Sequence, residues 1–266
     1  MKQLALFTQH KPVALTDYDY IVISSSGGKD SQAMLAHVHA QAILQGVEDR
    51  LVVVHADLGD MEWPGTREVA QAQADVFGVP FEVVSRIGQV AKQTSALYTQ
   101  GEVYGDLLDY AIRRGSWPSA QARWCTSEFK RGPISRFLTK LAKQHPTKPC
   151  RILDCWGLRA EESPARAKKH VLSERKRTRN QHIDTWLPIH HWEEARVWET
   201  IRATKMPVHP AYALGMGRLS CVFCILAPKA QLKLAAKHNP ELFERYVEVE
   251  QVLEHTFKHK LALAEI

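Results

Sequence analysis

The stretch DYIVISSSGGKDS, from Asp19 to Ser31, decides the fold. Its first half is a short apolar run that ends in small polar residues, a pattern typical of a buried strand leading into a loop. The segment that follows, QAMLAHVHAQAILQG, carries apolar residues at helical spacing until Gly46. The sequence therefore predicts a strand, a glycine-rich loop and a helix, in that order.

The loop SSSGGKDS has the chemistry of a phosphate site. Gly27 and Gly28 permit a tight turn with exposed backbone N–H groups, and Lys29 adds a positive charge. The helix that follows contributes the positive end of its dipole. Hydroxyl donors surround the turn on four serines: Ser24, Ser25, Ser26 and Ser31. Each of these features favours binding of a phosphate group.

Two other interpretations of this loop explain less. A Walker A motif requires Gly where this chain has Ile23, and Ser or Thr where it has Asp30. An ordinary strand-to-helix turn, capped by Asp30 or Ser31, would account for the glycines. It would not account for three serines and a lysine in the same turn.

The rest of the chain continues the alternation of strands and helices. Further strands are predicted at LVVVHADLGD, PFEVVS and RILDCWG, and a helix at WPGTREVAQAQADVFG. This order predicts an α/β fold, a Rossmann-like parallel sheet sandwiched by helices. From residue 193 onward three segments read as helical: EEARVWETIRATK, PKAQLKLAAKH and PELFERYVEVEQVLEHTFKHK. We therefore predict a nucleotide-binding part over residues 1–192 and a largely helical C-terminal part over 193–266.

Composition sets limits on the class of protein. With 266 residues and 45% hydrophobic content, the chain is able to bury a substantial core. No apolar stretch reaches the roughly 20 residues that span a bilayer. The segment MKQLALFTQHKPVALTDYD lacks the apolar core of a secretory signal. The sequence thus predicts a cytoplasmic protein without a membrane partner.

The chain is basic, with a net charge of +6 and a pI of about 9.0. Much of the excess lies in RAKKHVLSERKRTRN, from Arg166 to Asn180. Such a run is typical of a solvated, mobile loop. It also suits a surface for phosphates, including nucleic acid, because clustered Lys and Arg displace counterions from a polyanion. The sequence alone leaves both interpretations open.

Cysteines form one clear motif, the Cys-x-x-Cys of GRLSCVFCILAP, with Cys221 and Cys224. Such a pair forms a redox disulfide, holds zinc or holds an iron–sulfur cluster. Five cysteines, an odd number in a chain of this size, do not indicate a disulfide framework. Metal ligation or catalysis is the expected use of the pair.

These motifs together resemble a known group of proteins. Ser-Gly-Gly-Lys-Asp-Ser after a first strand resembles the PP-loop of the adenine nucleotide α-hydrolase superfamily, whose members split ATP between the α- and β-phosphates. Other blocks resemble the phosphoadenosine phosphosulfate (PAPS) reductase family, and they occur in its order. They are HADLGDMEWPGT, RWCTSEFKRGPISRFL, GLRAEESPARA, LPIHHWEEARVWETI and MPVHPAYALGMGRLSCVFC.

The resemblance implies a site for ATP with Mg²⁺. Catalytic roles would fall to Lys29, Asp30 and Arg159. The nucleotide or its metal would be bound by Ser24, Ser26, Gly27, Gly28, Lys29, Asp30, Ser31, Asp57, Arg159 and Arg166. Two alternatives stay open: Asp57 would also serve as a loop cap, and the two arginines would also form ordinary ion pairs with Glu161 and Glu162.

The resemblance also bears on the cysteines. The iron–sulfur branch of the family holds a [4Fe–4S] cluster with four cysteines, and here Trp124 stands in the place of one of them. Cys125, Cys221 and Cys224 are at matching positions, and Cys150 is a further candidate for the fourth ligand. Zinc held by three cysteines and a histidine remains the alternative.

Reductases of the family carry a nucleophilic cysteine near the C-terminus, and no cysteine follows Cys224 here. The sequence is therefore interpreted as an ATP pyrophosphatase that activates an acceptor for sulfur insertion, closest in kind to the enzymes of DNA phosphorothioation. Its partners would be DNA, a cysteine desulfurase as sulfur donor and other proteins of the modification system. Alternatives are a PAPS or adenylyl-sulfate reductase, a tRNA-thiolating sulfurtransferase and a non-catalytic nucleic-acid-binding protein.

Overall fold

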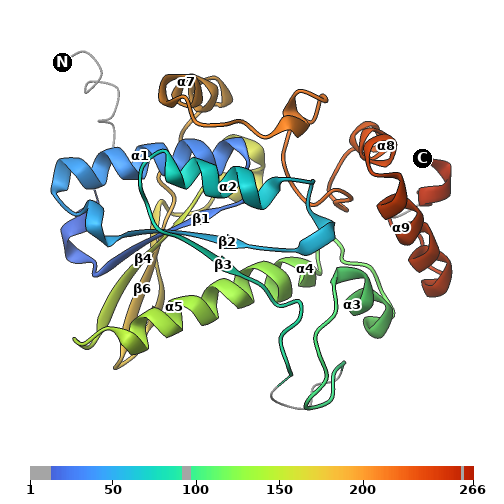
Figure 1. Cartoon of the computed structure of the whole chain (residues 1–266), viewed down its shortest axis with the longest axis horizontal. Coiled ribbons are helices and arrows are strands. Elements are labelled where there is room, and N and C mark those ends of the chain that lie inside the picture. The colour runs from blue at the N-terminus through green and yellow to red at the C-terminus, as the bar shows by residue number, and fades with distance from the viewer. Residues whose placement is uncertain (1–12, 92–96, 259–260) are drawn as a thin grey trace.

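One mixed sheet organises the molecule, seen in a computed structural model that describes residues 13–91, 97–258 and 261–266 (Figure 1). The strand order is β3-β2-β1-β4-β6-β5. All neighbours pair in parallel except β5, which is antiparallel to β6. The strands are β1 Tyr20–Ser25, β2 Leu51–Ala56, β3 Phe81–Val84, β4 Cys150–Trp156, β5 Leu172–Arg177 and β6 Gln181–Trp186. The predicted α/β fold is confirmed.

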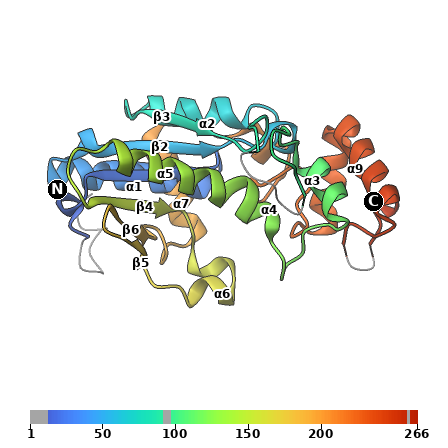
Figure 2. The ribbon, with the colours of Figure 1, turned by 90° about the horizontal axis from the view of Figure 1, so that it is seen from below.

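Helices cover both faces of this sheet. Helices α1, α2 and α7 lie on one face and α5 on the other, whereas α3, α8 and α9 gather beyond the carboxyl ends of the parallel strands (Figures 1 and 2). The helices are α1 Lys29–Gln45, α2 Thr66–Asp75, α3 Leu107–Arg114, α4 Trp124–Thr126, α5 Gly132–Gln144, α6 Pro164–Ala167, α7 Glu194–Thr204, α8 Lys229–His238 and α9 Pro240–Leu253. The last predicted helix thus ends earlier than its sequence suggested, and residues 259–260 of it lie outside the described part.

Strand β1 shows how the core forms on both faces. Ile21 and Ile23 pack with α1 and α7, while Val22 packs with α5. The alternation follows because successive side chains of a strand point to opposite faces. All three side chains are fully buried, and each burial is worth about 1.5–3 kcal/mol.

A third apolar cluster joins the C-terminal helices to the loops at the carboxyl edge. It contains Met61 and Trp63 from the loop after β2, Trp124 from α4, and Phe223 and Tyr246 from the C-terminal part. Helix α7, by contrast, packs on α1 beside the sheet. The cluster holds the Cys-x-x-Cys segment against the edge where the PP-loop lies.

The basic run is more ordered than one of its two interpretations suggested. Residues 164–167 form α6, and Leu172–Arg177 form the edge strand β5, so the run is not a loop throughout, although most of its strand is exposed. Charged side chains suit such an edge because they prevent pairing with another sheet. Within the strand Arg175 turns inward, contacts Asp154 and donates to Ser135 Oγ at 2.6 Å.

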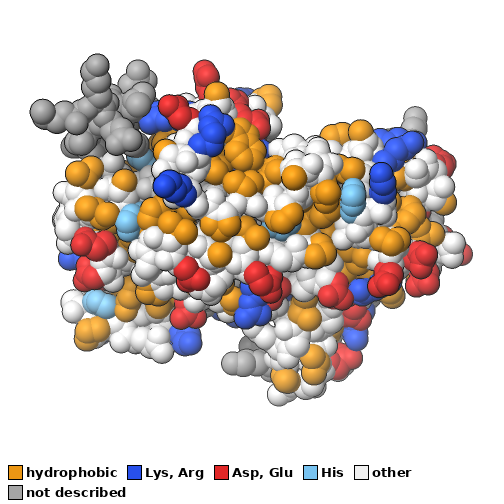
Figure 3. All heavy atoms as spheres, turned by 45° about the horizontal axis from the view of Figure 1, so that its top comes forward, with side chains coloured by type: hydrophobic (Ala, Val, Ile, Leu, Met, Phe, Trp, Pro, Cys, Tyr) orange, Lys and Arg blue, Asp and Glu red, His pale blue; other side chains and the backbone are white. Residues whose placement is uncertain are grey.

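Charge is otherwise dispersed on the face that α1, α2 and α7 cover. Lys and Arg are interspersed there with Asp and Glu, so the positive excess does not gather on this side (Figure 3). Within the described residues no helix is long and apolar enough to cross a membrane. The expectation about a secretory signal rests on residues 1–19, of which 1–12 lie outside the described part.

Buried His37 predicts a pH dependence of stability. Its ring lies in α1 with centroids 5.2 Å from Trp192 and 6.3 Å from Trp186. Burial lowers the pKa of His37 to about 4, and nearby Arg196 adds to the effect. Between about pH 6.5 and pH 4 the imidazole of His37 is therefore protonated in the unfolded chain and neutral in the folded chain. The free energy of unfolding falls as the pH drops through this range.

We expect the wild type to lose about 2 kcal/mol of unfolding free energy from this group between about pH 7 and pH 5. Urea unfolding of wild type and His37→Gln at both pH values measures it, because the uncharged amide removes the titration. If wild type and His37→Gln lose the same unfolding free energy between the two pH values, groups other than His37 cause the loss.

Candidate functional site

The PP-loop lies at the point where the sheet order reverses. Strand β1 pairs with β2 on one side and with β4 on the other. Loops at the carboxyl ends of such strands form the ligand crevice of open α/β sheets. A Cβ on Gly157, just after β4, would lie 3.0 Å from Asp30 O. The glycine therefore lets the segment after β4 close directly on the start of α1.

Glycines and serines together shape the loop. Gly27 has a φ of +70°, and a Cβ on it would lie 3.0 Å from Thr66 O, so a side chain there is excluded by backbone and space. Ser31 Oγ donates to Gly28 O at 2.9 Å and accepts from Ser26 N at 3.2 Å. Ser25 Oγ accepts from Gly27 N at 3.2 Å. Short side-chain hydrogen bonds thus hold the turn in one conformation.

A pocket of about 150 Å³ opens over this loop. Its volume is below the roughly 300 Å³ at which complete small-molecule sites begin, so it suits a phosphate chain better than a whole nucleotide. Its lining residues come from the PP-loop, the segment after β4 and the C-terminal part: Ser24, Ser26, Gly28, Asp30, Ser31, Gly157, Leu158, Glu162, Arg166, Tyr212, Arg218 and Leu219.

Lys29 is not among the residues that line that pocket. Its side chain is 3% exposed, and Nζ donates to Gly217 O at 2.8 Å. Nζ also lies 3.6 Å from Glu194 and 3.9 Å from Asp30. The ammonium therefore joins the start of α1 to the segment that carries Arg218.

Tyr212 closes the other side of the same helix start. Its hydroxyl oxygen accepts from Lys29 N at 2.8 Å, and burial raises the pKa of Tyr212 to about 12. A Cβ on Gly28 would lie only 3.2 Å from this hydroxyl. A larger residue at this position would thus press on Tyr212 and on Leu219 of the C-terminal part.

Arg159 is buried beneath the pocket. Its Nε donates to Asp30 Oδ1 at 2.5 Å, its guanidinium contacts Glu161, and NH1 lies 3.5 Å from Trp192 O. The side chain is 3% exposed and does not line the pocket. This geometry agrees with the ion-pair alternative and gives Arg159 the role of orienting Asp30.

Two arginines bring positive charge to the pocket, and Arg123 lies near enough to act on one of them. Arg166 and Arg218 line it, and both contact Glu162, Arg218 NH1 at 3.7 Å. Burial lowers the pKa of Arg166, and the charges of Arg218 and Arg123 lower it further. Arg166 and Arg218 thus offer two guanidinium groups to an oxyanion, beside the carboxylates of Asp30 and Glu162.

Cysteines from distant segments meet beside this site. Cys125 belongs to α4, and Cys221 and Cys224 lie in the loop before α8; all three are partly buried. Burial raises the pKa of Cys221 to about 11; Cys224 and Cys125 add to the rise, and Lys130 opposes it. Cys221 in turn raises the pKa of Lys130. The three thiols are therefore close enough to interact, with one lysine among them.

The comparisons with known proteins agree with this architecture. The family model of the phosphoadenosine phosphosulfate reductase domain matches residues 20–227. The chain belongs to this family. A phosphoadenylyl-sulfate reductase of Candida auris, solved with phosphate, has a TM-score of 0.50 to it at 14% identity, over 78% of this chain and 84% of the reductase. At that identity the likeness shows a shared fold.

Two curated relatives of this reductase-family chain are more similar in sequence. An uncharacterized 37.8 kDa protein of Escherichia phage 186 is 26% identical over 259 residues, which cover 87% of this chain and 75% of the phage protein. An uncharacterized protein of Methanocaldococcus jannaschii is 24% identical over 248 residues, covering 93% of this chain and 52% of its own length. The chain thus spans about half of the archaeal protein.

The three thiols are spaced more widely in this structure than the ligands of a single zinc ion. Zn–S bonds of about 2.3 Å place two thiolates of a tetrahedral site about 3.8 Å apart. The sulfurs of Cys125, Cys221 and Cys224 do not all lie within 4.8 Å of one another, since the described residues form only two ligand groups that tight, both elsewhere. A [4Fe–4S] cluster is wider and takes one thiolate per iron.

Cys150 does not belong to this group. It begins β4 at the amino-terminal edge of the sheet, while Cys125 lies near the carboxyl edge (Figure 2). Its position excludes it as a fourth ligand, and the correction has a simple reason: a strand of seven residues separates the two edges. Cys155 is fully buried inside the same strand, as expected for a small apolar side chain.

Asp57 lies in a second group of polar side chains, at the end of β2. Its Oδ1 accepts from Gly59 N at 2.7 Å, which agrees with the loop-cap alternative. Oxygen or nitrogen atoms of Asp57, His55 and Glu62 also lie within 4.8 Å of one another. His55 faces Ser25 O with Nδ1 at 3.1 Å and Glu62 with Nε2 at 3.0 Å. Both nitrogens then donate, so His55 forms an ion pair, and only the carboxylates are free to take Mg²⁺.

Proposed function

We propose that this reductase-family chain is an ATP pyrophosphatase. It would bind the β- and γ-phosphates over the PP-loop and join AMP to an oxygen of its acceptor. Sulfur would then replace that oxygen. The proposed acceptor is a phosphate of the DNA backbone.

A five-residue segment, Gly217–Cys221, carries this proposal. Gly217 O accepts from Lys29, and Arg218 and Leu219 line the phosphate pocket. Two residues further, Cys221 joins the group of three thiols. The activated acceptor and the sulfur-handling thiols would therefore stand on either side of one short segment. Both halves of the reaction fit this arrangement.

The chemistry divides into two displacements. The acceptor oxygen attacks the α-phosphorus of ATP, the bond to the bridging oxygen breaks, and pyrophosphate leaves between Arg166 and Arg218. The terminal sulfur of a persulfide then attacks the activated phosphorus of the acceptor, and AMP leaves with the acceptor oxygen. A thiol then cleaves the sulfur–sulfur bond between product and persulfide carrier, which releases the sulfur-substituted product and leaves a disulfide on the carrier. A cluster on the three cysteines would supply an iron that holds the incoming sulfur.

The surface near the pocket supports a polyanionic acceptor. Helix α6 and strand β5 carry the basic run past Arg166, at one edge of the sheet (Figure 2). Most side chains of β5 are exposed. A DNA strand that lies along this edge would bring one of its backbone phosphates to the pocket. A cysteine desulfurase is the proposed source of the persulfide, and Mg²⁺ would accompany ATP at Asp57.

Replacing Arg166 by alanine tests the phosphate pocket. We expect pyrophosphate release from ATP to fall about 100-fold, because a partly buried oxyanion donor is lost. Arg177→Ala is the matched control, since that arginine lies in the same basic run, is 64% exposed and pairs only locally with Glu174. Equal rates in Arg166→Ala and Arg177→Ala would contradict the assignment.

The acceptor is tested separately, with wild-type protein, desulfurase and radiolabelled sulfur. Label in nuclease-resistant dinucleotides from DNA supports the proposal. Label in tRNA instead would contradict DNA as the acceptor but would agree with the proposed ATP pyrophosphatase activity. Sulfite release from a sulfonucleotide with a thiol reductant, without pyrophosphate release from ATP, would favour the reductase.

A further inference from the structure

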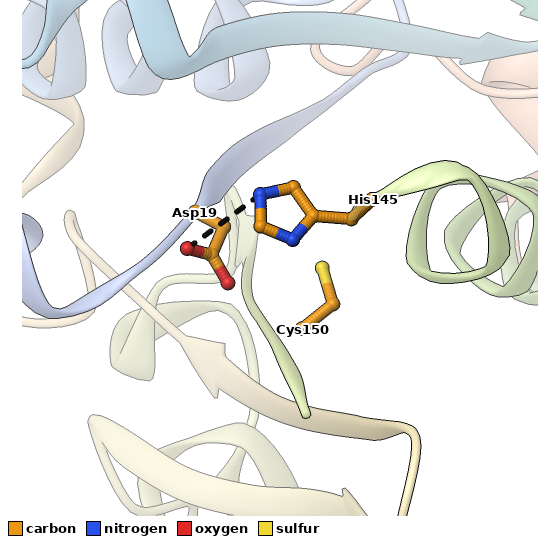
Figure 4. A group of neighbouring side chains, drawn as sticks. All are labelled: Asp19, His145 and Cys150. Atoms are coloured by element: carbon orange, nitrogen blue, oxygen red, sulfur yellow. Dashed lines mark ion pairs between the residues drawn. The ribbon is translucent and has the colours of Figure 1, made fainter. Parts of the chain in front are cut away.

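The amino-terminal edge of the sheet holds a second group of ligand-type side chains, far from the PP-loop. Asp19 precedes β1, His145 directly follows α5, and Cys150 begins β4 (Figure 4). One ligand atom from each lies within 4.8 Å of the other two. The segment before β1 and the connection from α5 to β4 thus bring a carboxylate, an imidazole and a thiol together.

The spacing between Asp19 and His145 suits an ion better than a direct hydrogen bond. His145 Nε2 lies 3.8 Å from Asp19 Oδ1, which is beyond the roughly 2.7–3.2 Å of a hydrogen bond. Two ligands of one tetrahedral zinc ion lie about 3.3–3.8 Å apart, given bonds of about 2.0–2.3 Å. The gap between these side chains is therefore the one an ion fills.

Backbone contacts orient each ligand for that use. His145 Nδ1 lies 3.1 Å from Thr147 O, so it carries the proton and leaves the Nε2 lone pair facing Asp19. Arg151 N donates to Asp19 Oδ2 at 2.7 Å, which leaves Oδ1 toward the group. Cys150 N donates to Asn180 O at 3.1 Å and fixes the start of β4. Such second contacts are typical of metal ligands.

Charge and burial exclude the obvious alternative, a reactive thiol. Cys150 is fully buried, and burial together with Asp19 raises its pKa to about 11. A nucleophile needs the opposite, an accessible thiolate of low pKa. Lys148 does not neutralise the site directly, because its ammonium is held by the last carbonyls of α5, including His145 O at 2.6 Å.

We propose that Asp19, His145 and Cys150 bind a zinc ion, with water as the fourth ligand. Nitrogen, sulfur and oxygen donors in one set favour zinc over Mg²⁺ or Ca²⁺, which take oxygen alone. One thiolate and one carboxylate balance the double charge. The ion ties the end of α5 to the starts of β1 and β4 and is independent of the nucleotide site.

Zinc chloride titration of chelator-treated protein tests this site. We expect wild type to bind one zinc that is lost, or weakened at least about tenfold, in both Asp19→Asn and His145→Ala. Asn keeps an acceptor for Arg151 N, so Asp19→Asn preserves the fold while it removes the charge. Cys155→Ala is the matched control, since it removes another fully buried thiol of β4.

Cobalt separates this site from the three-cysteine group. The Co²⁺ protein should show a sulfur-to-cobalt band that disappears in Cys150→Ala and survives in Cys221→Ala. Unchanged zinc affinity in Asp19→Asn and His145→Ala would overturn the proposal. Loss of all cobalt–sulfur absorbance in Cys221→Ala would also overturn it.

Discussion

Replacing Lys29 by alanine should reduce pyrophosphate release from ATP by at least about 100-fold. The ammonium is buried at the start of α1 and donates to Gly217 O at 2.8 Å. Alanine removes a positive charge next to the PP-loop and the bond that holds the segment with Arg218 and Leu219. Both changes weaken the site that would receive the leaving pyrophosphate.

A pair of further variants identifies the cause of that loss. Lys29→Met keeps the aliphatic packing without the charge, so it should lose as much activity as Lys29→Ala. Lys205→Ala removes an exposed lysine at the end of α7 and should retain the wild-type rate. Thermal unfolding of each variant shows whether the fold is intact. If Lys29→Ala releases pyrophosphate at the wild-type rate, the assignment of the PP-loop as the ATP site is contradicted.

The second large effect concerns Cys221. Anaerobically purified wild type should contain iron and sulfide and absorb near about 400 nm, and Cys221→Ala should lose this absorbance and most of its iron. Because burial raises the pKa of Cys221 to about 11, the thiol is protonated at neutral pH until a metal displaces the proton. Loading should therefore release protons and weaken as pH falls.

Cys155→Ala serves as the control for this measurement. That thiol is fully buried in β4 and belongs to neither ligand group, so its loss should leave the iron content unchanged. A colourless wild-type protein with zinc bound at the three cysteines would reject the cluster. Iron retained in Cys221→Ala would reject the ligand assignment.

The sequence predicted the fold because its local patterns are strong. The run before Ser24 is apolar and ends in small polar residues, and the hydrogen bonds of Ser25 and Ser31 show why the loop needs hydroxyls. Gly27 adopts a positive φ that other residues rarely adopt. Family motifs placed Cys125 near Cys221 although almost a hundred residues separate them.

Other features depend on contacts that no local pattern carries. Arg159 and Arg166 lie in one motif, yet Arg159 turns toward Asp30 and only Arg166 reaches the pocket. Sequence reasoning missed Arg218 and Tyr212 as pocket residues, although the Gly-Arg before the Cys-x-x-Cys and the Pro-x-Tyr block were available signals. Cys150 was misassigned because spacing along the chain does not say at which edge of a sheet a residue lies.

The segment Gly217–Cys221 joins the two halves of the site through five consecutive residues. We therefore expect a ligand that shifts Arg218 and Leu219 to shift Cys221 as well. Such coupling acts equally in both directions. If bound phosphates raise the affinity of the three thiols for their metal tenfold, the bound metal raises the affinity for phosphates tenfold, which is about 1.4 kcal/mol. An enzyme built this way would spend little ATP before its sulfur arrives.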